Sequence, residues 1–327
     1  PAGAARPPAL SGRLILLDEL RGLTLISMIL YHFMWDLYYI VGITFPWKYG
    51  MYAPGMHIWQ QSICWTFILL SGFCWSLGHH PFRRGMIVFG CGLVVTAVTV
   101  LFVPEYLILF GVLTFLGAAM LLTGLLQTLA ASVGGGARKV LQKRHLHLEA
   151  DGGRTVRTRP ARTKTGAPGA VLPGSRQRED DDREPGRFPR RSPCVKKAAS
   201  AAACLYLFYM LRWMPRRVLR FWPGMQLPLP DGLYNVFGEG SAAGYVMTGL
   251  GFMMPGFFSA DYFPLVPWIF LFWAGMFLHG MLALREALDR PAFHLQEPVL
   301  NWMGRHSLLL YMLHQPVLYL LTLLVFS

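Results

Sequence analysis

The chain has 327 residues, of which 54% are hydrophobic and only 14% are charged, whereas a soluble domain carries about 25% charged residues. Ten of the formal net charge of +13 fall within residues 133–200, a Pro- and Gly-rich stretch with a single aromatic residue. The composition therefore excludes a pair of soluble domains, and the lack of stacking side chains in the basic stretch argues against nucleic-acid binding. The apolar composition predicts an all-α fold, a polytopic transmembrane helical bundle.

Six stretches of the chain are long and apolar enough to span a bilayer, which takes about 20 residues. A seventh span is expected at 198–214, although its purely apolar part, 201–211, is about half the required length. The six clear spans are 23–41, 58–77, 86–103, 107–131, 265–284 and 307–326.

A basic segment interrupts the apolar pattern. Residues 132–202 show no apolar period and contain dense runs of charge, which is typical of disorder. We expect 1–131 and 203–327 to form a single membrane-embedded bundle, with 132–202 as a disordered cytoplasmic insert.

The distribution of basic residues predicts the orientation of the bundle. Three arginines precede the first span, and Arg83 and Arg84 lie between the second and third, whereas the loop after the first span carries only Lys48. Because basic residues are enriched on the cytoplasmic side, we expect a multi-pass plasma-membrane protein with a cytoplasmic N-terminus.

Whether the seventh span crosses the membrane determines on which side of it two other groups of arginines lie. If 198–214 crosses, the arginines of 212–220 lie outside; if it does not, those of 285–305 do. Crossing is preferred, because it leaves the aromatic, Pro-rich segment 259–268 at the outer face.

The first span carries three ionisable residues. Arg21, His32 and Asp36 fall close to one face of a helix, and ionisable groups inside a span are costly enough to suggest function. Asp36 lies one turn beyond His32, where it could orient the imidazole and raise its basicity, as a general base requires. The alternative is a His–Asp pair that only locks two helices together.

The last span presents a second polar face. Tyr311, His314 and Gln315 share it by three- and four-residue spacing, and Pro316 frees a backbone carbonyl. These side chains could polarise a reacting carbonyl group. Hydrogen bonding between helices is the alternative.

Three segments carry a family resemblance. The first has Leu20-Arg21-Gly22 followed by His32 and Asp36, the second is 255–265, which includes Asp261, and the third is 300–317, which includes Gly304-Arg305-His306. In this order they resemble the heparan-α-glucosaminide N-acetyltransferase catalytic-domain family, in its short bacterial form. The resemblance covers nearly the whole chain except the insert and the uncertain span.

The resemblance implies acetyl transfer from acetyl-CoA, as a co-substrate held without a metal at the cytoplasmic side. The acceptor is an amine or hydroxyl of a sugar-like molecule, either a small molecule or a glycan. His32 matches the catalytic position of the family's first helix and is expected to deprotonate the acceptor; the alternative is that it carries the acyl group as a nucleophile. The residues assigned to the site are His32, Asp36 and His314 for catalysis, Arg21, Arg83, Arg84 and Arg305 for the cofactor, and Gln315, Tyr311 and Asp261 for the substrate.

The chemistry of the donor agrees with this assignment. CoA is a polyanion with a long, thin arm, so its site needs cations at one face and a narrow path inward. The four assigned arginines all fall at predicted cytoplasmic ends of spans. Other expected partners are the lipid bilayer and a second copy of the chain in a homodimer.

Two other functions use the same residues differently. A transporter would use the buried His and Asp as a proton relay, and would favour inverted repeats with broken helices, which the sequence does not show. A scaffold without catalysis would leave His32 and Asp36 unexplained.

Overall fold

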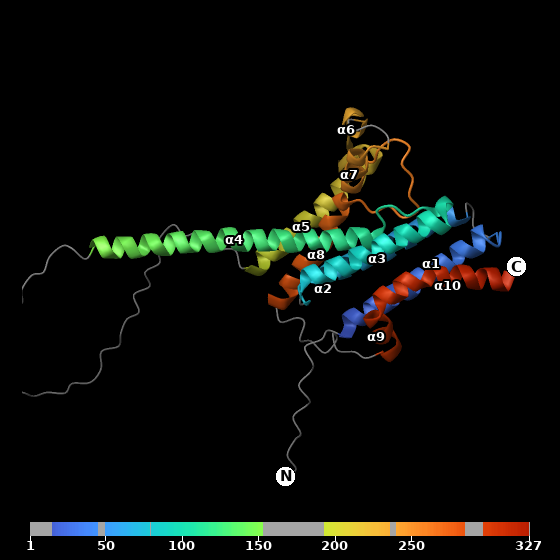
Figure 1. The fold of residues 1–327 in the computed structure, drawn as a ribbon, viewed down its shortest axis with the longest axis horizontal. Coiled ribbons are helices and arrows are strands. Elements are labelled where there is room, and N and C mark those ends of the chain that lie inside the picture. The colour runs from blue at the N-terminus through green and yellow to red at the C-terminus, as the bar shows by residue number, and fades with distance from the viewer. Residues whose placement is uncertain are drawn as a thin grey trace, which may run out of the picture. The chain divides into compact units, whose positions relative to one another are not determined.

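The computed structural model describes residues 15–44, 50–78, 80–152, 193–235, 240–284 and 297–326, shown in Figure 1. The chain divides into two compact units, 1–124 together with 192–327, and 125–191. All candidate site residues lie in the first unit, which is described below.

Helices dominate the described residues. A short antiparallel hairpin follows α5 and pairs Leu219 of β1 with Leu227 of β2. The elements are α1 (Ile15–Tyr39), η1 (Gly50–Tyr52), α2 (Pro54–Trp75), α3 (Pro81–Phe102), η2 (Pro104–Tyr106), α4 (Val112–Gly152), α5 (Pro193–Leu211), η3 (Met214–Arg216), β1 (Val218–Trp222), β2 (Met225–Pro228), α6 (Gly232–Asn235), α7 (Ala242–Leu250), α8 (Leu265–Leu284), α9 (Pro298–Arg305) and α10 (Ser307–Phe326).

Five helical segments in the described part of the chain are long and apolar enough to cross a membrane. They include the uncertain seventh span, and they are Pro81–Phe102, Val112–Val133, Pro193–Arg216, Leu265–Leu284 and Ser307–Phe326. The first two predicted spans form helices of 25 and 22 residues but are not among the five. Polar residues lower their hydropathy, such as His32 and Asp36 on α1 and Gln60 and Gln61 on α2. The helical fold with several candidate membrane-spanning helices is thus confirmed, while the predicted count of six or seven spans is not.

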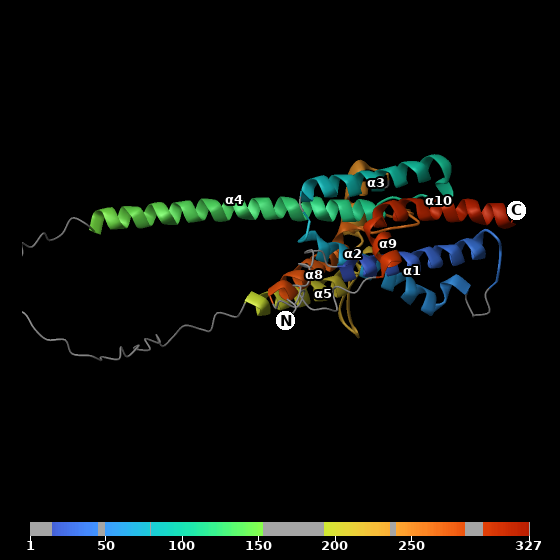
Figure 2. The same cartoon turned by 90° about the horizontal axis from the view of Figure 1, so that it is seen from below.

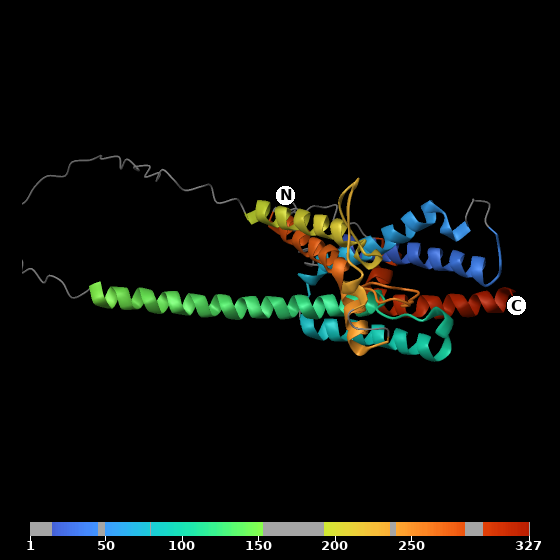
Figure 3. The same ribbon diagram turned by 90° about the horizontal axis from the view of Figure 1, so that it is seen from above.

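Two pairs of neighbouring helices define the directions of the helices in the first unit. α1 and α10 lie side by side and parallel in all three views (Figures 1, 2 and 3), with His32 facing His314. α5 and α8 are antiparallel, since Lys197 contacts Phe277 near one end and Phe208 contacts Trp268 near the other. We call the end at which α1 and α10 begin the amino end of the bundle.

Glycines bring two helix pairs into backbone contact. A Cβ built on Gly22 of α1 would lie 2.3 Å from the carbonyl oxygen of Leu300, and one on Gly304 of α9 would lie 1.8 Å from that of Asp18. Gly72 and Gly275 bring α2 and α8 together in the same way. Close approach through small residues is the usual basis of helix packing in membranes, and here it fixes α9 against the first turns of α1.

The loop between α7 and α8 is fixed to the loop between α3 and α4. The backbone N–H of Phe263 donates to the carbonyl of Phe110 at 2.8 Å, and that of Ala260 to Leu107 at 2.9 Å. The Asp261 carboxylate accepts from the backbone N–H of Val112, the first residue of α4, at 3.0 Å. Asp261 therefore satisfies one of the free N–H groups at the start of α4.

Helical structure enters both ends of the range predicted as an insert. α4 continues to Gly152 and α5 begins at Pro193. The sequence from 138 to 150 is rich in Ala, Leu, Lys, Arg, Gln and Glu, which have high helix propensity, and this outweighs the lack of an apolar period. Residues 153–192 lie outside the described part of the chain.

Candidate active site

Two histidines meet where α1 packs against α10. The ring centroids of His32 and His314 are 4.9 Å apart with their planes at 60°. The ring of Tyr31 lies edge-on to His32 at 5.9 Å. Both imidazoles are half-buried, so the site brings together two side chains whose ring nitrogens can accept or donate hydrogen bonds.

The hydrogen bonds of His314 define its tautomer when the ring is neutral. Its Nδ1 lies 2.7 Å from the carbonyl oxygen of Tyr311. A carbonyl can only accept, so Nδ1 carries the proton and Nε2 carries the lone pair. Nε2 is buried and has no hydrogen-bond partner among the described residues. His314 thus presents an unused proton acceptor inside the bundle.

Asp36 is held by α10 rather than by His32. The residue is 1% exposed, and its Oδ1 accepts a hydrogen bond of 3.0 Å from Nε2 of Gln315. Asp36 Oδ2 and Gln315 Oε1 are buried without a partner in the described part of the chain. The one-turn spacing allowed Asp36 a hydrogen bond or a charge pair with His32. The hydrogen bond is not formed, because Asp36 bonds to Gln315 and the His32 ring lies against His314.

Tyr311 connects the histidine pair to the α7–α8 loop. Its ring lies 5.4 Å from His314 and stacks on Phe67 of α2 at 5.7 Å. Its hydroxyl is close enough to the Asp261 carboxylate and the Cys64 thiol to interact with them electrostatically. The assigned substrate residues of the last span and the loop therefore lie in one neighbourhood, which sequence spacing alone does not establish.

Two of the four assigned arginines interact at the amino end. The Arg21 guanidinium lies 3.5 Å from the Asp18 carboxylate and is near enough to that of Arg84 for the two charges to repel. Arg84 lies directly over Gly78, where a built Cβ would come within 1.5 Å of its Nη1. Gly78 therefore makes room for the Arg84 guanidinium.

The other two arginines are exposed at the same end. Arg83 precedes Arg84 in the first turn of α3. Arg305 closes α9 and donates from Nε to Asn301 at 3.0 Å. The preceding Gly304 touches the backbone of Asp18, so Arg305 also lies beside the start of α1. No group of three or more side chains suited to holding a metal occurs among the described residues.

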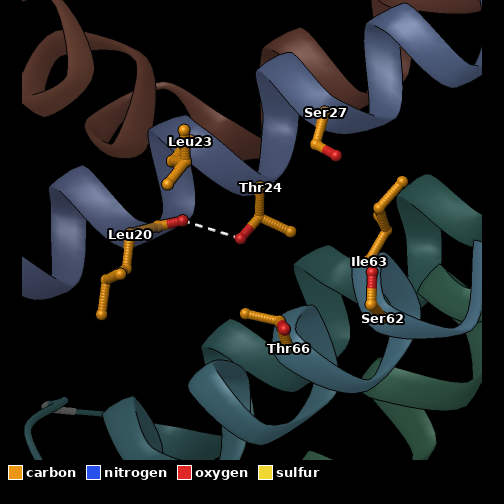
Figure 4. Close-up of a pocket in the computed structure, with 7 residues that line it drawn as sticks. All are labelled: Leu20, Leu23, Thr24, Ser27, Ser62, Ile63 and Thr66. Atoms are coloured by element: carbon orange, nitrogen blue, oxygen red, sulfur yellow. Dashed lines mark hydrogen bonds between the residues drawn. The ribbon is translucent and has the colours of Figure 1, made fainter. Parts of the chain in front are cut away.

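A groove between α1 and α2 lies at the height between Arg21 and His32 (Figure 4). Within it, the Thr24 hydroxyl donates to the carbonyl of Leu20 at 2.7 Å. The α1 residues of the groove point roughly 130° around the helix axis from the face of Arg21 and His32. This groove therefore does not form the expected passage between them. Its lining is Leu20, Leu23, Thr24, Ser27, Ser62, Ile63 and Thr66.

Three glycines that shape the site were not predicted from the sequence as site residues. Gly22, Gly78 and Gly304 each allow a contact that places an arginine or the helix that carries it. The available signal was adjacency, since Gly22 follows Arg21 and Gly304 precedes Arg305 in the motif segments. Gly78 follows α2 without such a pattern.

Comparison with known proteins gives one match. The family model described as heparan-alpha-glucosaminide N-acetyltransferase, catalytic, matches residues 13–137 and 235–316, more than half of the chain. All ten candidate site residues fall within these two ranges. No curated protein and no solved structure matches the chain.

Proposed function

Since the chain belongs to the heparan-α-glucosaminide N-acetyltransferase catalytic family, which implies acetyltransferase activity, we propose that it moves an acetyl group from acetyl-CoA to a sugar-like acceptor. The reacting group of the acceptor is an amine or a hydroxyl. We further propose that acetyl-CoA binds at the amino end of the bundle, on the cytoplasmic side of the plasma membrane. The family match supports the reaction class, and the contacts of the two histidines support the assignment of the chemistry.

The observation that carries the proposal is the free Nε2 of His314 beside the His32 ring. One imidazole takes the proton from the acceptor as its nitrogen or oxygen attacks the thioester carbon. The carbon–sulfur bond then breaks, and the CoA thiolate receives a proton from the other imidazole. The side-chain N–H of Gln315, the residue after His314, donates to Asp36 four positions after His32, and this hydrogen bond ties α1 to α10 at the height of the two imidazoles.

The charge and length of acetyl-CoA support its binding at the amino end of the bundle. CoA carries phosphates, which arginine forks bind strongly, and Arg21, Arg83, Arg84 and Arg305 gather at the amino end. Arg21 and His32 are eleven residues apart on one helix, about 16 Å in axial rise, which is comparable to an extended pantetheine arm. The acceptor then approaches along Tyr311, Gln315 and Asp261.

Replacement of His314 tests the chemistry. In proteoliposomes with labelled acetyl-CoA, we expect His314→Gln and His32→Ala each to lower kcat about 10²–10⁴-fold, the usual contribution of a general acid or base. His279 of α8 is the matched control for the histidine pair, because its ring lies 5.1 Å from that of Phe73, whereas His32 and His314 contact each other. His279→Gln should keep the wild-type kcat. Full turnover by His314→Gln and His32→Ala would contradict the assignment, and proton transport without acetyl transfer would favour the transporter.

The donor assignment has its own test in the same assay. Gly78→Ala must displace Arg84, since the new Cβ would meet its Nη1. We expect KM for acetyl-CoA to rise while kcat changes little, because only binding of the phosphates is lost. Gly90→Ala is the control, as a Cβ there meets nothing within 4 Å. An unchanged KM in Gly78→Ala would refute the proposal that Arg84 binds acetyl-CoA.

A further inference from the structure

Three arginines in the segment that follows α5 share one aromatic ring. The guanidinium carbons of Arg212, Arg216 and Arg220 lie 5.1, 4.9 and 4.8 Å from the ring centroid of Trp213. Arg212 also lies 4.9 Å from the ring of Trp65 on α2. Because each cation is about 5 Å from one point, any two of them are within about 10 Å, near the Debye length at physiological salt.

Among the described residues, no carboxylate is paired with this arginine cluster. In the described ranges, no carboxylate lies within ion-pair distance of the cluster, whereas the neighbouring Arg217 pairs with Asp231. Trp213 Nε1 and Arg220 Nε are buried donors without an acceptor in those ranges. Cation–π contacts hold the guanidinium groups in place, but within the described part of the chain no carboxylate neutralises their three like charges.

The hairpin that carries Arg220 also carries exposed apolar side chains. Arg220 belongs to β1, opposite Gln226 of β2. Beside it, Trp222, Met225 and Leu227 are 57%, 44% and 50% exposed. Exposed apolar groups next to arginines and tryptophans are characteristic of protein surfaces at the membrane interface, where rings enter the lipid and cations meet headgroups.

We propose that the cluster of Arg212, Arg216 and Arg220 over Trp213 binds the phosphate group of an anionic phospholipid, with the hairpin side chains lying among the lipid. Guanidinium forks match phosphate oxygens in geometry and charge. The cluster lies in 138–234, outside the residues that the family model matches. The proposal is therefore independent of the proposed acetyl transfer.

Thermal unfolding of the purified full chain in a neutral detergent tests the site. Phosphatidylglycerol should raise Tm, and phosphatidylcholine at the same concentration should not. Replacing all three arginines (R212Q, R216Q, R220Q) should abolish the rise, whereas Arg217→Gln should retain it, because Arg217 already has a carboxylate partner. If the triple variant does not fold, Arg216→Gln alone removes the exposed member of the cluster. It should raise the phosphatidylglycerol concentration for a half-maximal shift about fivefold.

Three results would overturn the proposal. The first is a phosphatidylglycerol response that survives the triple replacement or, if that protein does not fold, is unchanged in Arg216→Gln. The second is an equal response to phosphatidylcholine, which would indicate a general effect of lipid. The third is an equal response to inorganic phosphate, which would indicate a site for soluble anions.

Discussion

Gly304→Ala should separate α9 from α1. A Cβ at this position lies 1.8 Å from the carbonyl oxygen of Asp18 and 2.5 Å from its carbonyl carbon, and Cβ atoms essentially never approach another heavy atom below 3.0 Å. The helices must therefore part by about 1.2 Å. The contacted atoms are backbone, so no side chain can rotate away to absorb the strain.

The cost can be worked from this geometry. Overpacking costs about 1–3 kcal/mol, and the movement also strains the hydrogen bond in which Glu19 accepts from the backbone N–H of Glu297, worth about 1 kcal/mol. Alanine regains about 1 kcal/mol over glycine in a helix. We expect a net loss of about 1–3 kcal/mol, and Arg305 should move with its helix.

Thermal unfolding in detergent and the KM for acetyl-CoA measure the two effects. Gly304→Ala should lower Tm and raise KM, whereas Gly90→Ala, whose Cβ meets nothing within 4 Å, should not lower Tm and should keep the wild-type KM. Equal Tm values for the two variants would refute the tight contact between α1 and α9. A lower Tm with an unchanged KM would refute only the link to Arg305.

Two further predictions concern the carboxylates of Asp36 and Asp261. Gln315→Ala leaves the buried Oδ1 of Asp36 without its donor and should cost about 1–3 kcal/mol of stability. Thermal unfolding measures this loss, and the double variant Asp36→Leu/Gln315→Leu should recover part of it. Wild-type stability of Gln315→Ala would contradict the prediction. Burial raises the pKa of Asp261 from 3.8 to about 6, despite the opposing hydrogen bond from Val112. A raised folded-state pKa gives stability that is present below about pH 4 and lost as the pH rises through about 6. The Tm of the wild type should therefore fall over this range relative to Asp261→Asn, and parallel profiles would contradict the assignment.

Local sequence patterns predicted the helices best where the apolar run was continuous. The spans 265–284 and 307–326 coincide with α8 and α10 to the residue, because polar residues and prolines bound both runs. The start of α5 was placed five residues late, since Pro193 and the lysines after it lack apolar character but suit the first turns of a helix. Helix formation needs less apolar sequence than a membrane span does, so hydropathy underestimates helix length.

The site was predictable within one helix and not between helices. The periodicity of α1 placed Arg21, His32 and Asp36 near one face, and that of α10 did the same for its polar residues. Which residues meet across the interface depends on the register and rotation of two helices that are far apart in sequence. Asp36 therefore pairs with Gln315, 279 positions away, in preference to His32, which one-helix geometry favoured.

The glycine–arginine pairs of the two motif segments have a common geometric explanation. At the crossing of α1 and α9, Gly22 meets the backbone of Leu300 and Gly304 meets that of Asp18, so each helix contributes one glycine to the contact with the other. An arginine next to either glycine is then necessarily close to the crossing. Arg21 and Arg305 come from opposite ends of the chain, yet the backbone contact holds both at the amino end, where cations suit an anionic donor. The two glycines therefore set the positions of Arg21 and Arg305, and a substitution at either glycine can move these arginines apart without replacing them.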